Sequence, residues 1–132
     1  MSDATPDPRF AEAQALAEAT NPGITEALRA RYDAHVPGLA DMVINVSFGE
    51  FYNRPGLDIR TRYLATIAAL AALGGQTKPQ LQVHVQNALN AGASKTEIAE
   101  VIYQMALYGG FPAMINALNA AIEVFERQGE AP

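Results

Sequence analysis

Apolar residues recur every three to four positions along most of the chain, which is the period of an amphipathic α-helix. No segment shows the strict alternation of apolar and polar residues that a half-buried β-strand requires. The pattern therefore predicts an all-α fold, a compact bundle of six to seven helices. We expect a single domain over residues 1–132, with residues 1–9 and 128–132 loose.

Glycine, proline and capping residues divide the pattern into separate helices. Ser94 and Glu97 have the spacing of a capping box, and so do Thr77 and Gln80. A helix is expected after each box, and the helix after Thr77 ends at Gly92 while the helix after Ser94 ends at Gly109-Gly110. The other expected helices cover Phe10–Ala19, Ile24–His35, Leu39–Tyr52, Ile59–Leu73 and a last segment that begins near Pro112.

The segment Leu39–Tyr52 contains an acid in an unusual place. Leu39, Met42, Val43 and Val46 have the spacing of a buried helical stripe, and Glu50 is its next step. A carboxyl group on such a stripe has a raised pKa and can serve as an acid or a base. The alternative is a structural role, in which Glu50 pairs with an arginine or caps a helix.

The helix expected over Ile59–Leu73 is apolar on nearly every side, and its second part reads LATIAALAAL. Such a helix is normally buried all round. A chain of 132 residues has difficulty surrounding one helix completely. We therefore expect a subunit interface on this helix and a homo-oligomer.

Composition and charge exclude several classes of function. The net charge is −5 without a basic run, so neither nucleic acid nor an anionic membrane is an expected partner. The chain has no cysteine and only two histidines, which leaves no thiol chemistry and no recognisable metal-ligand set. No signal peptide and no apolar stretch of membrane-spanning length is present, so the expected compartment is the cytoplasm.

His84 is the best candidate for chemistry. Leu81, Val85 and Ala88 define the apolar face of its helix, and His84 is three residues after Leu81 and four before Ala88, so it points toward the same side. A half-buried imidazole can exchange a proton near neutral pH. The alternative is a core or interface histidine whose hydrogen bonds are satisfied.

Three arginines flank the Pro55-Gly56 turn, and they are Arg54, Arg60 and Arg62. Guanidinium groups bind carboxylates in bidentate geometry, so this group suits an anion clamp. Surface or intersubunit salt bridges are the alternative. Tyr108 precedes Gly109-Gly110, where its hydroxyl either reaches a polar pocket or remains wet above a packed ring.

Several segments together resemble one known family. The stretch Phe48–Arg62, FGEFYNRPGLDIRTR, is similar to an FGE…RPGL signature of 4-carboxymuconolactone decarboxylases. The stretch Leu81–Ala113 is similar to that family's H-V-x-x-A-x-N-x-G block, the helix that follows it, and a Tyr-x-Gly-x-Pro corner. From about residue 25 to 126, the chain thus resembles the carboxymuconolactone decarboxylase-like family, within the alkylhydroperoxidase-like superfamily.

The resemblance implies a helical fold that forms trimers or hexamers and a decarboxylation without a cofactor. The implied substrate is a small organic anion, a carboxymuconolactone or a related unsaturated or oxo acid lactone. His84 matches the family histidine and would carry the proton, and Glu50 matches the acid of the FGE signature. Arg54 and Arg60 match arginines near the pocket.

The chain also departs from its apparent relatives. The thiol peroxidases of the superfamily carry a C-x-x-C pair where this chain has Thr77 and Gln80, so thiol peroxidase activity is excluded. Gln86 stands where the family commonly has an arginine, and Asn119 stands where decarboxylases commonly have a histidine. These departures leave the substrate open. An isomerase or hydrolase on the same scaffold, or a non-enzymatic oligomer that binds a small molecule, are the alternatives.

Overall fold

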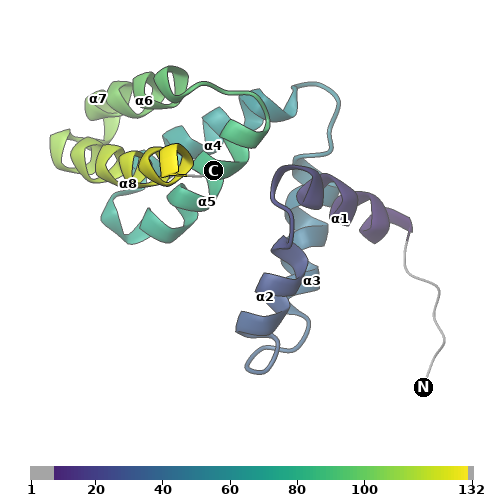
Figure 1. Ribbon diagram of the computed structural model, residues 1–132. Coiled ribbons are helices and arrows are strands. Elements are labelled where there is room, and N and C mark those ends of the chain that lie inside the picture. Colours follow the sequence, from purple (N-terminus) through teal and green to yellow (C-terminus); the bar gives the residue numbers. More distant parts are fainter. Residues whose placement is uncertain (1–7, 131–132) are drawn as a thin grey trace. The chain divides into compact units, whose positions relative to one another are not determined.

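The computed structural model describes residues 8–130, whose secondary structure consists of helices joined by turns and loops, with no strand among them (Figure 1). The all-α prediction is confirmed. The chain divides into two compact units, Met1–Leu57 and Asp58–Pro132, where the sequence pattern was interpreted as one domain. Each unit is described by itself below.

The first unit consists of α1 (Pro8–Thr20), α2 (Ile24–Tyr32), α3 (Leu39–Ile44) and a π-helical segment, η1 (Asn45–Phe51). Gly23 and Gly38 precede α2 and α3 with φ values of 88° and 86°, a left-handed conformation that costs glycine little. The helix α1 begins at Pro8, before the expected start at Phe10, so residues 8 and 9 are helical and not loose. Proline suits this position because the first helical N–H has no partner within the helix.

The buried face of α3 and η1 differs from the predicted one. Ala40, Ile44 and Phe48 are buried, whereas Met42 and Val46 of the predicted stripe are exposed. Both sets recur at helical spacing, so periodicity alone does not decide between them. The segment packs closely on α1, where Ala13 lies 3.5 Å from the position a Cβ would occupy at Gly49.

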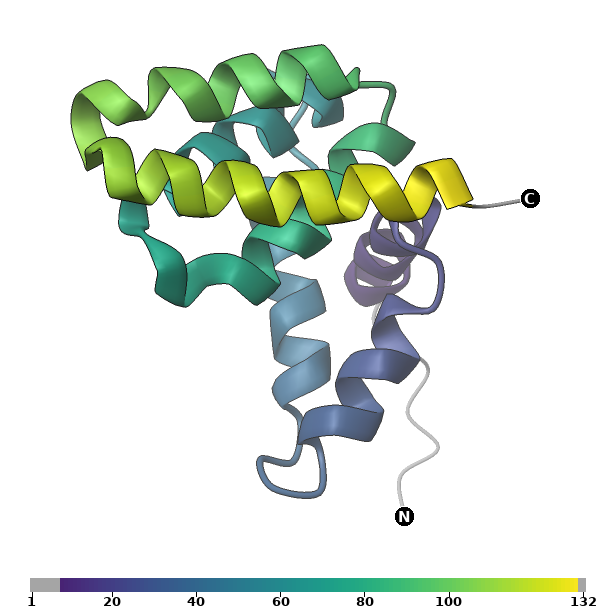
Figure 2. The same cartoon turned by 60° about the vertical axis from the view of Figure 1, so that its left-hand side comes forward.

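The second unit contains five α-helices and one turn of 3₁₀-helix among its described residues. They are α4 (Ile59–Leu73), η2 (Gly75–Thr77), α5 (Lys78–Asn90), α6 (Lys95–Gln104), α7 (Ala106–Gly109) and α8 (Phe111–Glu130). The helix α5 packs between α4 and α8, and Figure 2 shows α8 turning back beside α6. Because α8 continues to Glu130, residues 128–130 are helical and the expectation of a loose tail is wrong for them. Residues 1–7 and 131–132 lie outside the described residues.

Two helices of this unit bury only one face within the chain. In α4 the buried residues are Tyr63, Ile67 and Ala71, and Leu73 is 61% exposed, so the single chain does not surround this helix, as expected from the length of the chain. In α8 the small residues Ala117 and Ala121 face inward. Several larger apolar residues of the same helix are exposed, and they are Phe111, Ile115 and Ile122. Oligomerisation, which would cover such faces, stays a prediction.

One of the two predicted capping boxes is present. At α6, Glu97 N donates to Ser94 Oγ over 3.0 Å and Ser94 N donates to Glu97 Oε1 over 2.9 Å, so this box is confirmed. At α5 the Thr77 box is wrong. Thr77 Oγ1 instead donates backward to the carbonyls of Leu70, at 2.7 Å, and Gly74, at 2.9 Å. The last carbonyl groups of a helix have no donor within the helix, and at the end of α4 they accept a hydrogen bond from the Thr77 hydroxyl.

Candidate active site

The imidazole of His84 lies on α5 against the neighbouring helix α4. Its ring centroid is 5.9 Å from that of Tyr63, at an interplanar angle of 47°. Tyr63 is fully buried, His84 is partly buried, and the Nδ1 atom of His84 is shielded from solvent. The expectation that His84 points into the apolar side of its helix is therefore met by its position.

Burial determines the protonation state of His84. Desolvation lowers its pKa from the ordinary value of 6.5 to about 4. A low-dielectric environment disfavours the imidazolium, so the ring is neutral at pH 7. In this state His84 is a base or a hydrogen-bonding group, and it becomes an acid only when something stabilises the added proton.

A second polar side chain is buried one turn further along α5. Asn87 is 1% exposed, and its Oδ1 atom has no hydrogen-bond partner among the described residues. Residues three apart share a side of a helix, so Asn87 and His84 belong to the same side of α5. Sequence reasoning missed both Asn87 and Tyr63.

Glu50 belongs to the first unit, and His84 belongs to the second. The side chain of Glu50 is exposed, so the prediction that Glu50 continues a buried stripe is wrong. The π-helical turn carries it to a small cavity of about 210 Å³, which Arg9 and Asn45 also line. π-helical turns are rare and occur frequently at functional sites, which keeps Glu50 of interest.

The three arginines have different surroundings. Arg60, at the start of α4, forms an ion pair with Glu97 of the α6 capping box and so ties the two helix starts together. Arg62 is partly buried on α4, and Arg54 is exposed in the turn after η1. Arg60 thus has a structural partner already, and an anion would have to share it with Glu97. Tyr108, on α7, is 79% exposed.

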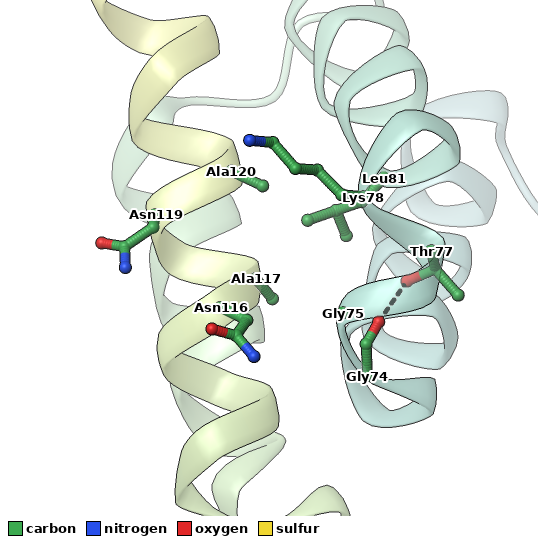
Figure 3. A pocket seen from close by; sticks show the side chains of 9 residues that line it. All are labelled: Gly74, Gly75, Thr77, Lys78, Leu81, Asn116, Ala117, Asn119 and Ala120. Atoms are coloured by element: carbon green, nitrogen blue, oxygen red, sulfur yellow. Dashed lines mark hydrogen bonds between the residues drawn. The ribbon is translucent and has the colours of Figure 1, made fainter.

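The two departures from the decarboxylase pattern lie away from the His84 side of α5. Gln86 donates to Asn90 Oδ1 over 3.0 Å and accepts from Gln128 Nε2 of α8 over 2.9 Å. Residues two apart on a helix point about 200° apart, so Gln86 and His84 do not share a side. Asn119 is on α8 at the edge of a cavity of about 350 Å³, between α8 and the segment from η2 to α5 (Figure 3).

The described part of the chain contains no group of three or more histidine, cysteine, aspartate or glutamate side chains that could hold a metal ion. Within residues 8–130, no helix has the length and apolar character needed to cross a membrane.

Comparison with known proteins places this arrangement in context. The chain is 41% identical over 117 residues, 89% of its length and 87% of the relative's, to an uncharacterized 15.0 kDa protein of the nqo9–nqo10 intergenic region of Paracoccus denitrificans. It is 40% identical over 92 residues, 70% of its length and 67% of the relative's, to the 4-carboxymuconolactone decarboxylase of Acinetobacter baylyi.

A third relative is the nitrosuccinic acid decarboxylase of Metarhizium robertsii, which is 31% identical over 78 residues, 59% of this chain and 53% of that protein. The model of the carboxymuconolactone decarboxylase family matches residues 37–123. The resemblance seen in the sequence is confirmed, and the chain belongs to the carboxymuconolactone decarboxylase family.

Proposed function

We propose that this protein is a decarboxylase of a small organic acid, with His84 as the proton carrier. The observation that carries the proposal is the buried, neutral imidazole of His84 in a member of this family. Two relatives are named as decarboxylases, and the names give two different acids, a carboxymuconolactone and nitrosuccinic acid. Decarboxylation is thus the common element, and a carboxymuconolactone-like or related oxo acid lactone is the substrate we favour.

The reaction needs few groups from the protein. The bond between the carboxylate carbon and its neighbour breaks, CO2 leaves, and the electron pair moves into the conjugated carbonyl of the substrate. A proton then adds to carbon, so one proton is consumed for each CO2 released. The protein must bind an anion, stabilise the delocalised charge and deliver that proton, and no cofactor is required in this scheme.

The neutral resting state of His84 fits this sequence of events. A nearby carboxylate stabilises imidazolium, so a bound organic anion would raise the pKa of His84 and let it take a proton from solvent. The ring would then hold that proton until a carbanion forms beside it. Burial keeps His84 neutral without substrate, and the negative charge of the substrate favours the protonated form that donates the proton.

The anion-binding groups belong to the same proposal. Arg62 belongs to the same unit as His84 and is the arginine we favour for the substrate carboxylate, with Arg60 shared with Glu97. Arg54 stays a candidate on the family resemblance alone. Glu50 and Tyr108 remain candidates for contacts with the substrate. A homo-oligomer, a trimer or a hexamer, would cover the exposed apolar faces of α4 and α8.

The test measures CO2 release from 4-carboxymuconolactone by pure protein and by two matched histidine variants. His84→Gln should lower kcat by about 10²-fold or more, the usual contribution of a general acid or base. His35→Gln changes the other histidine, which is exposed, and should leave the rate within a factor of two. Equal and measurable rates for His84→Gln and the unmodified protein would refute the role of His84, and no CO2 release by the unmodified protein above a protein-free blank would reject this substrate.

One observation favours a second candidate, an isomerase. A neutral imidazole is a ready base, and moving a proton between two carbons of an unsaturated acid needs a base more than an acid. Incubating the protein with the unsaturated lactone in deuterated water separates the two. His84-dependent deuterium exchange without CO2 release would indicate the isomerase.

A further inference from the structure

The second unit contains a cavity on a different side of α5 from His84. It has a volume of about 350 Å³ and lies between α8 and the segment that runs from η2 into the first turn of α5 (Figure 3). Lys78 and His84 are six residues apart on α5, which separates their directions by about 120°. His84 does not line this cavity.

The floor of the cavity is apolar and made of small side chains. Leu81 of α5 and Ala117 and Ala120 of α8 are buried there. The larger apolar residues of α8, such as Ile115 and Ile122, are exposed on other sides of that helix. The alanines therefore leave a hollow beside α5 that the chain does not fill.

Lys78, whose side chain is about half exposed, stands at one end of the cavity. Figure 3 shows the Lys78 side chain reaching from α5 toward α8, and its Nζ lies 3.2 Å from Glu123 Oε1. Gln82 Nε2 donates to the other carboxylate oxygen of Glu123 over 2.7 Å, which fixes that carboxylate. An ammonium group has three donors, and this pair uses one of them.

An amide stands at the other end. The Asn116 side chain points from α8 toward η2, and its Nδ2 atom would lie 3.6 Å from a Cβ at Gly75 (Figure 3). Asn116 makes no side-chain hydrogen bond among residues 8–130, so its donors and its acceptor are available. The cavity thus combines a cation, an apolar floor and an amide.

We propose that this cavity is a second ligand site, which binds a small carboxylic acid. A carboxylate of the ligand meets the ammonium group of Lys78 at the first turn of α5. The carbon skeleton covers Leu81 and Ala120, and a second oxygen of the ligand accepts from Asn116. The volume is at the low end for ligand pockets, which suits an acid of about four to six carbons. Glu123 offsets the charge of Lys78, so the expected affinity is modest.

The test is a ¹H–¹⁵N NMR titration of the full chain with succinate at constant ionic strength. Backbone amides of residues 74–81 and the side-chain amide of Asn116 should shift and saturate. Lys78→Met and Asn116→Leu should each weaken binding by at least about fivefold, the size expected for one lost hydrogen bond. The control Lys95→Met changes the other lysine of the chain, which is on α6 outside the cavity, and should leave the affinity unchanged.

Three results would overturn the proposal. The first is the absence of saturable shifts at these amides. The second is the same set of shifts with sodium chloride in place of succinate, which would mean screening alone. The third is loss of succinate binding in His84→Ala, which would place the ligand at the His84 side of α5. The decarboxylase assay is independent of all three, so either proposal can fail while the other stands.

Discussion

Replacing Gly109 by alanine tests a close backbone contact between α7 and α4 in the second unit. Gly109 ends α7, and a Cβ at this position would lie 2.8 Å from Ala72 Cα and 2.9 Å from the Ala72 carbonyl oxygen. Both atoms belong to the backbone of α4, so no side chain can rotate away from the new methyl group. The corner between α7 and α8 would have to move away from α4.

The magnitude follows from two opposing effects. Overpacking of this kind costs about 1–3 kcal/mol. Alanine is the better helix residue by up to about 1 kcal/mol, which offsets part of that cost. We expect a net loss of about 1–2 kcal/mol in the free energy of unfolding, and roughly 4 °C in Tm for each kcal/mol in a chain of this size.

The assay is urea and thermal unfolding followed by circular dichroism, with Gly56→Ala as the matched control. Gly56 has no atom within 4 Å of its virtual Cβ and no positive φ, so this change should leave Tm within about 1 °C. A Gly109→Ala protein as stable as the unmodified chain would show that α7 does not pack on α4 at this distance.

Three other changes probe the candidate site and its support. Between pH 6.5 and 4 the unfolded chain protonates His84 while the folded chain resists, so stability should fall by up to roughly 3 kcal/mol as the pH drops through this range. When the free energy of unfolding is measured in urea at several pH values, His84→Phe should show a weaker dependence on pH between 6.5 and 4. An unchanged pH dependence would contradict the argument that burial lowers the pKa of His84. Ser94→Ala should cost about 1 kcal/mol by removing the capping bond to Glu97, and hydrogen exchange in α6 would locate the loss. Asn87→Leu should raise Tm, because it removes a buried amide oxygen that has no hydrogen-bond partner among the described residues, and a lower Tm would contradict this.

The sequence predicts helices well wherever local chemistry marks both ends. The bounds of α4, Ile59–Leu73, are those expected from Asp58 before the helix and Gly74 after it. The Ser94 capping box is also local, since both of its hydrogen bonds join Ser94 and Glu97, which are three residues apart. Features of this kind depend on only a few residues in sequence order.

The buried side of a helix is harder to predict, because two stripes can share one period. The segment Leu39–Tyr52 offered Met42 with Val46, and equally Ile44 with Phe48. The shape of the neighbouring helix decides between them, and sequence order does not contain that shape. The Thr77 box failed for a related reason, since the carbonyls of α4 compete for the same hydroxyl.

The site shows the same division. The partial burial of His84 followed from Leu81 and Val85 on its own helix. The ring of Tyr63 beside it lies 21 residues earlier in the sequence and could be identified only from the packing of α4 on α5. Asn87 gave no signal, because an asparagine at a helical position is normally exposed.

The position of Thr77 bears on the chemistry that the chain retains. The superfamily's thiol pair would occupy positions 77 and 80, and here the first position carries a hydroxyl that closes the end of α4. Gln80 is exposed on α5. A cysteine at position 77 would give up that strong hydroxyl bond, since a thiol is a weak donor. Introducing both cysteines should therefore destabilise the end of α4 first. The start of α5 in this chain thus holds the connection between α4 and α5 together.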